Sequence, residues 1–214
     1  MRVAIAGGHG KIGRILIKEL TARGDEVVSL DRNPAHGDDL RSWGAEPVVC
    51  DLESAPVDEV AAALGSAEAV MFSAGAGPGS GSERKWTMDH GGAVKLIEAV
   101  RAAGIDRYVM VSSIGADPDA EGDDTFAVYL RAKGSADAEL EASGLDYTIV
   151  RPTSLSDEEP TGRVEIAEHV ERRQVSRGDV AAVLAATLAA PNTSRKRFEL
   201  TAGDTPVAEA VAAI

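Results

Sequence analysis

The sequence predicts an α/β protein with a Rossmann-like, doubly wound parallel sheet, and three observations lead to this prediction. A short apolar run near the N-terminus ends in glycines and passes directly into an amphipathic segment. Apolar runs of strand length then alternate with segments of helical periodicity as far as residue 152. Polar or glycine-rich residues follow several of these runs, at the edge where nucleotide-binding sheets bind their ligands.

The first observation concerns residues 2–19. The apolar run Val3–Ala6 predicts a buried strand, and the spacing of Ile12, Ile15 and Leu16 predicts a helix directly after it. A strand, a tight turn and a helix form the opening unit of a nucleotide-binding sheet.

Three glycines occupy the predicted turn with the spacing G-x-x-G-x-x-G. We expect Gly7 to allow the sharp turn, Gly10 to leave room for a pyrophosphate, and Gly13 to let the helix pack closely. The free N–H groups near Lys11 and Ile12 should then face the phosphates, where the helix dipole favours negative charge. The alternative is an ordinary glycine-rich turn.

The second predicted strand, Asp25–Leu30, is followed by Asp31 and Arg32, where a dinucleotide fold contacts the adenosine ribose. A carboxylate there accepts hydrogen bonds from a free 2′-hydroxyl, whereas an arginine binds a 2′-phosphate through two hydrogen bonds. The sequence offers both residues, and the alternative is a solvated acid and base in a turn.

A short helix over Asp38–Trp43 and a strand over Pro47–Cys50 are predicted next. Asp51, just past the strand, could accept a hydrogen bond from the adenine amino group, and Leu52 could pack on the ring. The competing role for Asp51 is to cap the helix predicted over Val57–Leu64.

The fourth strand, Ala67–Phe72, leads into the glycine-rich segment 73–82, which predicts a loop. A flexible linker could have this composition. The loop follows a strand at the ligand-binding edge, so we expect Ser73, Ala74 and Gly75 to present their backbone to the cofactor.

The remaining elements follow from the same periodicities. They are a helix over Thr87–Ala103, strands over Arg107–Val111 and Tyr147–Val150, a candidate strand over Arg163–Ala167, a helix over Arg177–Ala190, a strand over Arg197–Leu200 and a helix over Val207–Ile214. The segment 153–177, polar as far as Gln174, is predicted to form a small C-terminal cap over a substrate cleft. Residues 1–214 are expected to form a single domain.

Candidate catalytic residues follow the fifth strand and lie on the next helix. Tyr129 and Lys133 are four residues apart, so they share one helix face. A lysine ammonium stabilises a nearby phenolate, which makes the tyrosine usable as a proton donor or acceptor. Ser113 or Ser112 could hydrogen-bond a substrate carbonyl, and Lys133 could also hold the nicotinamide ribose. The Y-x-x-x-K spacing alone is weak evidence, since isolated matches are common.

Composition limits the class of protein. The chain has 214 residues, 44% hydrophobic and 27% charged, and lacks the run of about 18 apolar residues that a membrane span needs. We expect a cytoplasmic protein without a signal peptide, either a monomer or a homodimer. The net charge of −13 argues against nucleic acid or an anionic membrane as partner, and favours a small-molecule substrate.

Cysteine and histidine usage points to no metal site. The single cysteine, Cys50, excludes an intrachain disulfide and is expected to be buried and inert. The four histidines lack metal-ligand spacing.

Together these motifs resemble the short-chain dehydrogenase/reductase superfamily, in its atypical compact NAD(P)H-binding branch of biliverdin/flavin reductase-like and NmrA-like proteins. The resemblance covers most of the chain and is carried by AGGHGKIG at 6–13, LDRNP at 30–34, VMVSSIGA at 109–116, YLRAK at 129–133, GLDYTIVRP at 144–152 and SRGDVA at 176–181. It implies NADP(H) along the carboxyl edge of the sheet, Arg32 at the 2′-phosphate and Pro152 beside the nicotinamide. Asp31 stands where NADP-preferring relatives often have a neutral residue, so NAD(H) remains an alternative.

These observations predict an NADP(H)-binding oxidoreductase that transfers hydride between the nicotinamide and a small carbonyl, quinone or flavin. Some members of the branch only sense the cofactor, so a non-catalytic NADP(H)-sensing regulatory module is the alternative. A nucleotide-sugar epimerase or dehydratase ranks last, because it would need a larger substrate domain than residues 153–214 supply.

Overall fold

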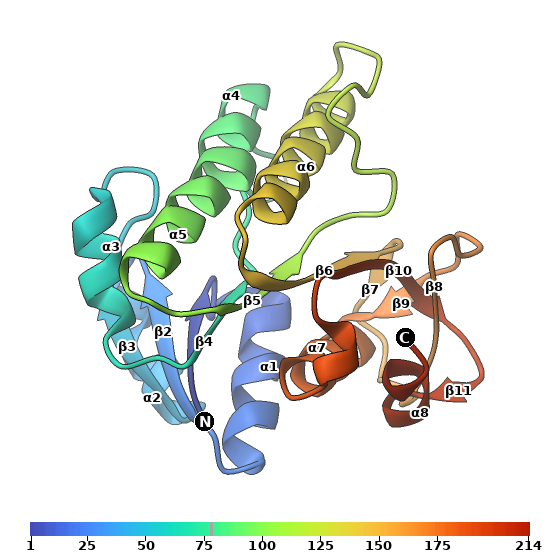
Figure 1. Cartoon of the computed structure of the whole chain (residues 1–214), viewed down its shortest axis with the longest axis horizontal. Helices are drawn as coiled ribbons and strands as arrows, with labels where there is room; N and C mark the ends of the chain where they lie inside the picture. Colours follow the sequence, from blue (N-terminus) through green and yellow to red (C-terminus); the bar gives the residue numbers. More distant parts are fainter. Residues whose placement is uncertain (78) are drawn as a thin grey trace.

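The computed structural model describes residues 1–77 and 79–214 and shows a nine-stranded sheet between two layers of helices (Figure 1). The strands are β1 (Arg2–Ala6), β2 (Glu26–Asp31), β3 (Ala45–Val49), β4 (Ala69–Phe72), β5 (Arg107–Val111), β6 (Asp146–Pro152), β7 (Leu155–Ser156), β8 (Arg163–Ala167), β9 (Val175–Ser176), β10 (Lys196–Ala202) and β11 (Thr205–Pro206). The helices are α1 (Lys11–Ala22), α2 (Gly37–Ser42), α3 (Val57–Leu64), α4 (Ser82–Arg84), α5 (Gly91–Ala102), α6 (Thr125–Ala142), α7 (Arg177–Leu188) and α8 (Val207–Ala212), with the short turns η1 (Pro34–His36), η2 (Lys85–His90) and η3 (Pro191–Thr193).

The sheet has the strand order β11-β8-β10-β6-β5-β4-β1-β2-β3. All pairings from β10 to β3 are parallel. In the described part of the chain, the antiparallel pairs of this sheet are β10 with β8 and β8 with β11, at one end of the sheet. The order reverses between β1 and β4, which is the switch point where such sheets bind ligands. This confirms the predicted Rossmann-like fold, with an antiparallel edge that the sequence analysis did not anticipate.

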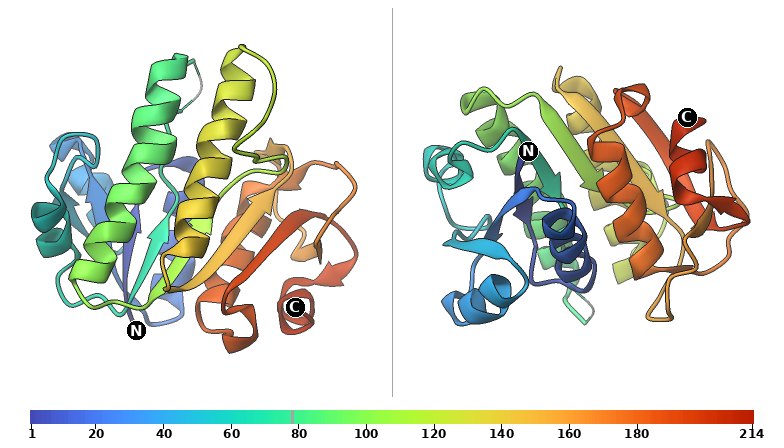
Figure 2. Two further views of the ribbon diagram at one scale, coloured as in Figure 1. Left: turned by 45° about the horizontal axis from the view of Figure 1, so that its top comes forward. Right: turned by 90° about the horizontal axis from the view of Figure 1, so that it is seen from below.

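Two hydrophobic clusters hold the layers together, one on each face of the sheet. The first joins the sheet to α3, α5 and α6, and the second joins it to α1, α2, α7 and α8. Helices α1 and α7 lie side by side on the second face (Figure 2). The central strand β4 is buried along its whole length, as expected for a parallel strand covered on both faces.

Helix and strand positions agree closely with the periodicities in the sequence. The bounds predicted for α3, β5 and β8 are confirmed, and Gly24 and Gly104 follow α1 and α5 with φ of 89° and 70°. The prediction was wrong about where the long helix begins, because the chain is already helical from Ser82 and passes through the π-helical turn η2 into α5. The polar residues Ser82–Arg84 carry no apolar periodicity that could mark this start.

The segment predicted as a cap is partly built into the sheet. Within residues 153–177, β8 pairs with β10, while β7 and β9 pair with each other in a separate two-stranded sheet. No helix within residues 1–77 and 79–214 is long and apolar enough to cross a membrane.

The contact between α1 and α7 produces a testable pH dependence. Burial, reinforced by the negative charge of Asp179, raises the pKa of Glu19 on α1 from 4.5 to about 7, and Arg23 lowers it only in part. At pH values between 4.5 and 7 the folded protein therefore binds more protons at Glu19 than the unfolded chain does, so this group lowers stability as the pH rises through that range.

We expect Glu19→Gln to raise the free energy of unfolding at pH 8 by about 1 kcal/mol, a value reduced for the partial exposure of the side chain. Near pH 4.5 the substitution should have little effect, because the carboxyl is then protonated in the folded protein. Urea denaturation at both pH values tests this, with the exposed Glu139→Gln on α6 as control. An equal change at both pH values would contradict the argument.

Candidate functional site

Two adjoining cavities lie at the carboxyl edge of the parallel strands, beside the switch point. The first has a volume of about 300 Å³ and is lined by residues that follow β1, β2, β3 and β4. The second has a volume of about 810 Å³ and lies between the segments after β4 and β5 and the first half of α6. Ser73, Ala74 and Gly75 line both cavities, so the two meet at the start of the glycine-rich loop.

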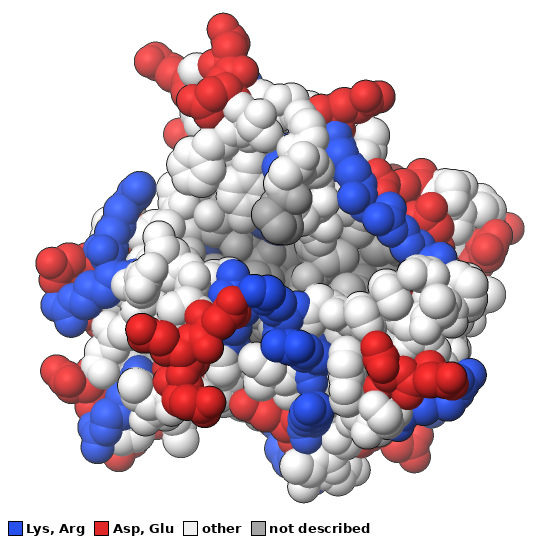
Figure 3. Space-filling model, turned by 180° about the vertical axis from the view of Figure 1, so that it is seen from behind, with Lys and Arg blue, Asp and Glu red and all other residues white. Residues whose placement is uncertain are grey.

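The loop 73–82 contains residue 78, which lies outside the described residues. The face shown in Figure 3 is hollowed near its centre and carries basic and acidic side chains around the hollow.

The glycine turn forms one wall of the first cavity. Gly7 has a φ of 88°, and a Cβ on it would lie 2.6 Å from the Cα of Ala74, so only glycine fits between β1 and the loop after β4. A Cβ on Gly13 would collide with the backbone of Gly7 and Gly8. Gly10 differs from these, because its backbone is extended (φ −66°, ψ 164°) and it lines the cavity. A Cβ on Gly10 would meet the Gly7 carbonyl oxygen at 3.1 Å, so Gly10 is the least crowded of these three positions.

The start of α1 is available to an anion. Gly10 is the N-cap residue, and no side chain among the described residues caps the helix there. The N–H groups of Lys11, Ile12 and Gly13 belong to the first turn, which has no partners within the helix. The side chain of Lys11 pairs with Asp157 at 2.5 Å, and that of Ile12 packs in the core, so their backbone rather than their side chains would serve a phosphate.

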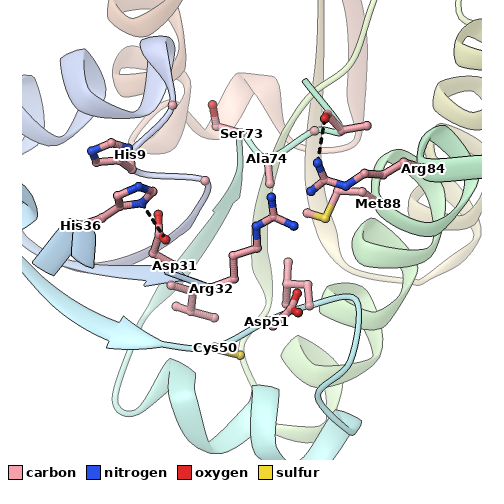
Figure 4. A pocket seen from close by; sticks show the side chains of 16 residues that line it. His9, Asp31, Arg32, His36, Cys50, Asp51, Ser73, Ala74, Arg84 and Met88 are labelled. Atoms are coloured by element: carbon pink, nitrogen blue, oxygen red, sulfur yellow. Dashed lines mark hydrogen bonds and ion pairs between the residues drawn. The ribbon is translucent and has the colours of Figure 1, made fainter. Parts of the chain in front are cut away.

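Asp31 and Arg32 lie at the end of β2, on the first cavity (Figure 4). Asp31 Oδ1 accepts hydrogen bonds from the Asn33 N–H at 2.8 Å and from His36 Nδ1 at 2.9 Å, so the carboxylate is held at the turn after β2. The Arg32 side chain is about half exposed, and its Nη1 lies 3.3 Å from Glu53 Oε2. A half-exposed guanidinium that makes one long contact can exchange this contact for a phosphate.

Glu53 connects the two arginines of the first cavity. Its carboxylate accepts hydrogen bonds from Arg84 at 3.1 Å and from Thr87 at 2.6 Å, in addition to Arg32. Burial alone would raise the pKa of Glu53, but the hydrogen bonds from Thr87 and Arg84 outweigh it and leave that pKa below its ordinary value. Arg84 also donates to the Ala76 carbonyl, and it lines the first cavity together with Arg32.

Asp51 and Leu52 both line the first cavity. The Asp51 carboxylate accepts hydrogen bonds from the Glu53 N–H at 3.0 Å and the Ser54 hydroxyl at 3.1 Å, which stabilises the turn after β3. The N-cap of α3 is Pro56, so Asp51 does not cap that helix. Leu52 is buried beneath the cavity.

Tyr129, Lys133 and Ser112 come together on the second cavity. Lys133 is almost fully buried, and its Nζ donates a hydrogen bond to the Val111 carbonyl at 2.6 Å. Tyr129 lies one turn earlier on α6, with the ammonium of Lys85 5.5 Å from its ring centroid. The cavity therefore combines a phenol with two lysines.

The two serines after β5 point in different directions. The Ser112 hydroxyl donates to Asp137 Oδ2 at 2.9 Å, so its lone pairs rather than its proton are available to the cavity. The Ser113 hydroxyl donates to the Ile114 carbonyl, and this residue lines neither cavity in the described part of the chain. Of the two serines, Ser112 is the one that lines the second cavity.

Asp137 supports this arrangement from behind. It lies one turn after Lys133 on α6 and accepts hydrogen bonds from Ser112 and from Arg151 at 2.8 Å. Burial raises the pKa of Asp137, opposed by the charge of Arg151 and the Ser112 hydrogen bond. Its Oδ1 has no hydrogen-bond partner among residues 1–77 and 79–214.

Pro152 ends β6 and is buried, and its carbonyl accepts the Ile114 N–H at 3.0 Å. Among the described residues it lines neither cavity, and Leu155 is the member of segment 153–177 that borders the second cavity. The carbonyl contact joins the end of β6 to the segment after β5.

Sequence reasoning missed His9, His36 and Arg84, which all line the first cavity. His9 lies inside the glycine turn, and its spacing from Gly7 and Gly10 was a signal that could have drawn attention to it. His36 and Arg84 lie in segments without apolar periodicity, and only the folded chain brings them to the cavity.

The fold and the two cavities define an NAD(P)H-binding α/β protein of the oxidoreductase type. The chain belongs to the NAD(P)H-binding family, whose sequence model matches residues 7–191, and to the atypical branch of the short-chain dehydrogenase/reductase superfamily.

Two relatives match along almost their whole length. The chain is 40% identical to a Bacillus subtilis protein named uncharacterized sugar epimerase YhfK, with 99% of each chain covered. It is 35% identical to the UPF0659 protein YMR090W of Saccharomyces cerevisiae, covering 97% of this chain and 96% of the relative.

Solved structures also resemble this chain along almost its whole length. A Bacillus halodurans protein, provisionally named an NAD-dependent epimerase/dehydratase, has a TM-score of 0.93 at 43% identity, with both chains fully covered. The oxidoreductase ylbE from Lactococcus lactis has a TM-score of 0.86 at 27% identity, covering 100% of this chain and 96% of the other. The anaerobillin reductase ChuY from Escherichia coli O157:H7 has a TM-score of 0.79 at 25% identity, and the match covers 95% of this chain and 98% of ChuY.

Proposed function

We propose that this protein is an NADP(H)-dependent oxidoreductase that transfers hydride between the nicotinamide and a small carbonyl, quinone or flavin. The observation that carries the proposal is the meeting of two cavities, one bordered by the glycine turn and basic side chains, the other by Tyr129 and Lys133. The reductase named among the similar structures supports a reduction as the reaction.

The residues of the first cavity fit a dinucleotide. Gly10 leaves space beside the uncapped start of α1, where backbone N–H groups can bind a pyrophosphate. Arg32 and Arg84 supply positive charge next to the end of β2, where the adenosine ribose binds in this fold. The loop after β4 would then carry the dinucleotide from the first cavity into the second.

In the second cavity a bound nicotinamide would supply the hydride for a reduction, and the chain would provide the proton; in the reverse reaction the chain would take up the proton. We assign proton transfer to the Tyr129 hydroxyl, with Lys133 fixed by the Val111 carbonyl so that its ammonium stays on the same helix face. For carbonyl reduction the substrate carbon receives the hydride and its oxygen takes the Tyr129 proton, which solvent then replaces. The segment 153–177, through Leu155, is proposed to cover the substrate.

The cofactor preference is tested by Arg32→Ala. We expect NADP(H) to bind more tightly than NAD(H), and the substitution to weaken NADP(H) binding by about 1.5–3 kcal/mol while NAD(H) binding changes little, because a charge-assisted contact to the 2′-phosphate is lost. Calorimetric titration of both cofactors measures this. Arg41→Ala, which removes an exposed arginine paired with Asp38 on α2, is the matched control. Equal affinities in the wild type would assign the ribose contact to Asp31.

A regulatory module that senses NADP(H) is the second candidate, and one observation favours it. Of the side chains Tyr129, Lys133 and Ser112 on the second cavity, two are hydrogen-bonded within the chain, Ser112 to Asp137 and Lys133 to Val111. A sensor needs only the binding site, so it would bind NADPH without oxidising it.

The name of the Bacillus subtilis relative makes sugar epimerisation a third candidate. After β6 the chain adds the helices α7 and α8 and five strands. Three of these strands, β8, β10 and β11, complete the main sheet, so little remains to enclose a nucleotide sugar. Incubation with nucleotide sugars tests this, because an epimerase would convert them without net consumption of cofactor.

A further inference from the structure

We propose that His36 makes the first cavity selective for a 2′-phosphorylated dinucleotide, by holding the Asp31 carboxylate away from the 2′-phosphate. The inference rests on the proposed function, because it concerns the cofactor site described above. It answers a conflict in the sequence, since a carboxylate at the end of β2 should repel a 2′-phosphate.

The Asp31 carboxylate is held by two donors on the same oxygen. Its Oδ1 accepts hydrogen bonds from the Asn33 N–H at 2.8 Å and from His36 Nδ1 at 2.9 Å, and its side chain is only 13% exposed. The Asn33 contact is local to the turn, whereas His36 reaches the carboxylate from η1 (Figure 4). His36 is therefore the contact that a substitution can remove without changing the backbone.

The hydrogen-bond network assigns the His36 proton to the atom that faces Asp31. Asn33 Oδ1 accepts the Ala35 N–H at 3.1 Å, so the amide nitrogen of Asn33 faces His36 Nε2 at 3.0 Å. An amide nitrogen can only donate, so Nε2 accepts and the ring proton resides on Nδ1. His36 thus donates from Nδ1 to the Asp31 carboxylate.

His9 fixes the plane of the His36 ring. The two rings stack with centroids 3.5 Å apart and an angle of 6° between their planes. His9 is held in turn by Asp39 at 3.1 Å from its Nε2 and by the ring of Trp43. Because His9 belongs to the glycine turn, the phosphate-binding turn and the end of β2 support each other.

Without His36, Asp31 would keep only the Asn33 contact and could turn toward the ribose. There it would accept a hydrogen bond from the free 2′-hydroxyl of NAD and repel the 2′-phosphate of NADP. His36 thereby leaves Arg32 as the side chain at this position that a 2′-phosphate meets.

The test is a calorimetric measurement of NADP⁺ and NAD⁺ affinity for wild type, His36→Leu and His36→Asn, each with Asp31 intact and with Asp31→Asn. His36→Leu should weaken NADP⁺ binding by about 10- to 100-fold relative to NAD⁺. His36→Asn should retain most of the preference, because its amide can donate to Asp31 from a position close to that of Nδ1. In the Asp31→Asn background, His36→Leu should change the ratio of affinities by less than about threefold.

Three results would overturn the assignment. An equal loss of affinity for both cofactors in His36→Leu would indicate a merely structural role for His36. An unchanged ratio of NADP⁺ to NAD⁺ affinity would indicate that His36 has no role in selectivity. An undiminished effect in the Asp31→Asn background would mean that His36 acts on the phosphate directly rather than through Asp31. These three results concern the variants and can be told apart from a failure of the proposed function. If the proposed function were wrong, the wild-type protein itself would bind neither dinucleotide, or would bind NADPH without oxidising it.

Discussion

Replacement of Gly10 by valine is expected to abolish dinucleotide binding, with a loss of affinity of at least about 100-fold, while the protein remains folded. Gly10 has extended backbone angles that a β-branched residue adopts without strain. A Cβ there would lie 3.1 Å from the Gly7 carbonyl oxygen. Because Gly10 lines the first cavity, we expect the two methyl groups of valine to enter it. They would occupy the space assigned to the pyrophosphate.

Calorimetric titration with NADP⁺, together with circular dichroism, tests this expectation. Gly10→Ala should give an intermediate affinity, because it adds only the Cβ. Gly13→Ala provides the contrast, since its Cβ would collide with the backbone of Gly7 and Gly8 and should lower the stability of the protein itself. A folded valine variant with normal affinity would show that the pyrophosphate binds elsewhere.

The second large effect is expected from Tyr129→Phe. The substitution keeps the ring, which contacts Lys85 and stacks with Phe126, and removes only the hydroxyl. NADPH affinity should therefore stay nearly unchanged, while turnover of carbonyl substrates should fall by about 10²- to 10⁴-fold, the usual contribution of general acid catalysis. Reduction of a flavin or quinone can take its proton from water, so that activity should largely survive.

Lys133→Ala is a less selective variant. Its ammonium donates to the Val111 carbonyl and lies 5.6 Å from the centroid of the Phe72 ring, so the substitution would also leave a buried acceptor and a cavity. We expect it to lower affinity, rate and stability together.

The fold was predictable because the sheet is buried on both faces and its helices are amphipathic. Strands such as β4 form uninterrupted apolar runs, and α1 and α3 repeat apolar residues at helical spacing, so their positions follow from the local sequence. The two-residue strands β7, β9 and β11 have no period to detect, and they form only where the folded chain brings partners together.

The part of the candidate site that could be predicted consists of residues that directly follow the strands, because their place in the chain fixes their place in the fold. The glycine turn and the residues after β2, β3 and β4 border the first cavity, because strand ends of a parallel sheet meet at one edge. Side-chain partnerships were not predictable, since His36 reaches Asp31 and Arg84 reaches Glu53 only in the folded chain.

The position of Asp137, which accepts a hydrogen bond from Ser112 on the second cavity, could have been predicted from the sequence. Tyr129, Lys133 and Asp137 repeat at intervals of four residues, which places all three on one face of α6. This spacing could have identified Asp137 as the partner of Ser112, a contact that determines which way the serine hydroxyl points.

The central claim, hydride transfer in the second cavity, is tested most directly by the rate of NADPH oxidation. Wild type and Tyr129→Phe should be compared with a panel of carbonyl, quinone and flavin acceptors, at NADPH concentrations that saturate both proteins. We predict that wild type oxidises NADPH with at least one acceptor class, and that Tyr129→Phe loses activity on carbonyls by about 10²- to 10⁴-fold. Tight NADPH binding with no oxidation by any acceptor would contradict the claim and favour the sensing module.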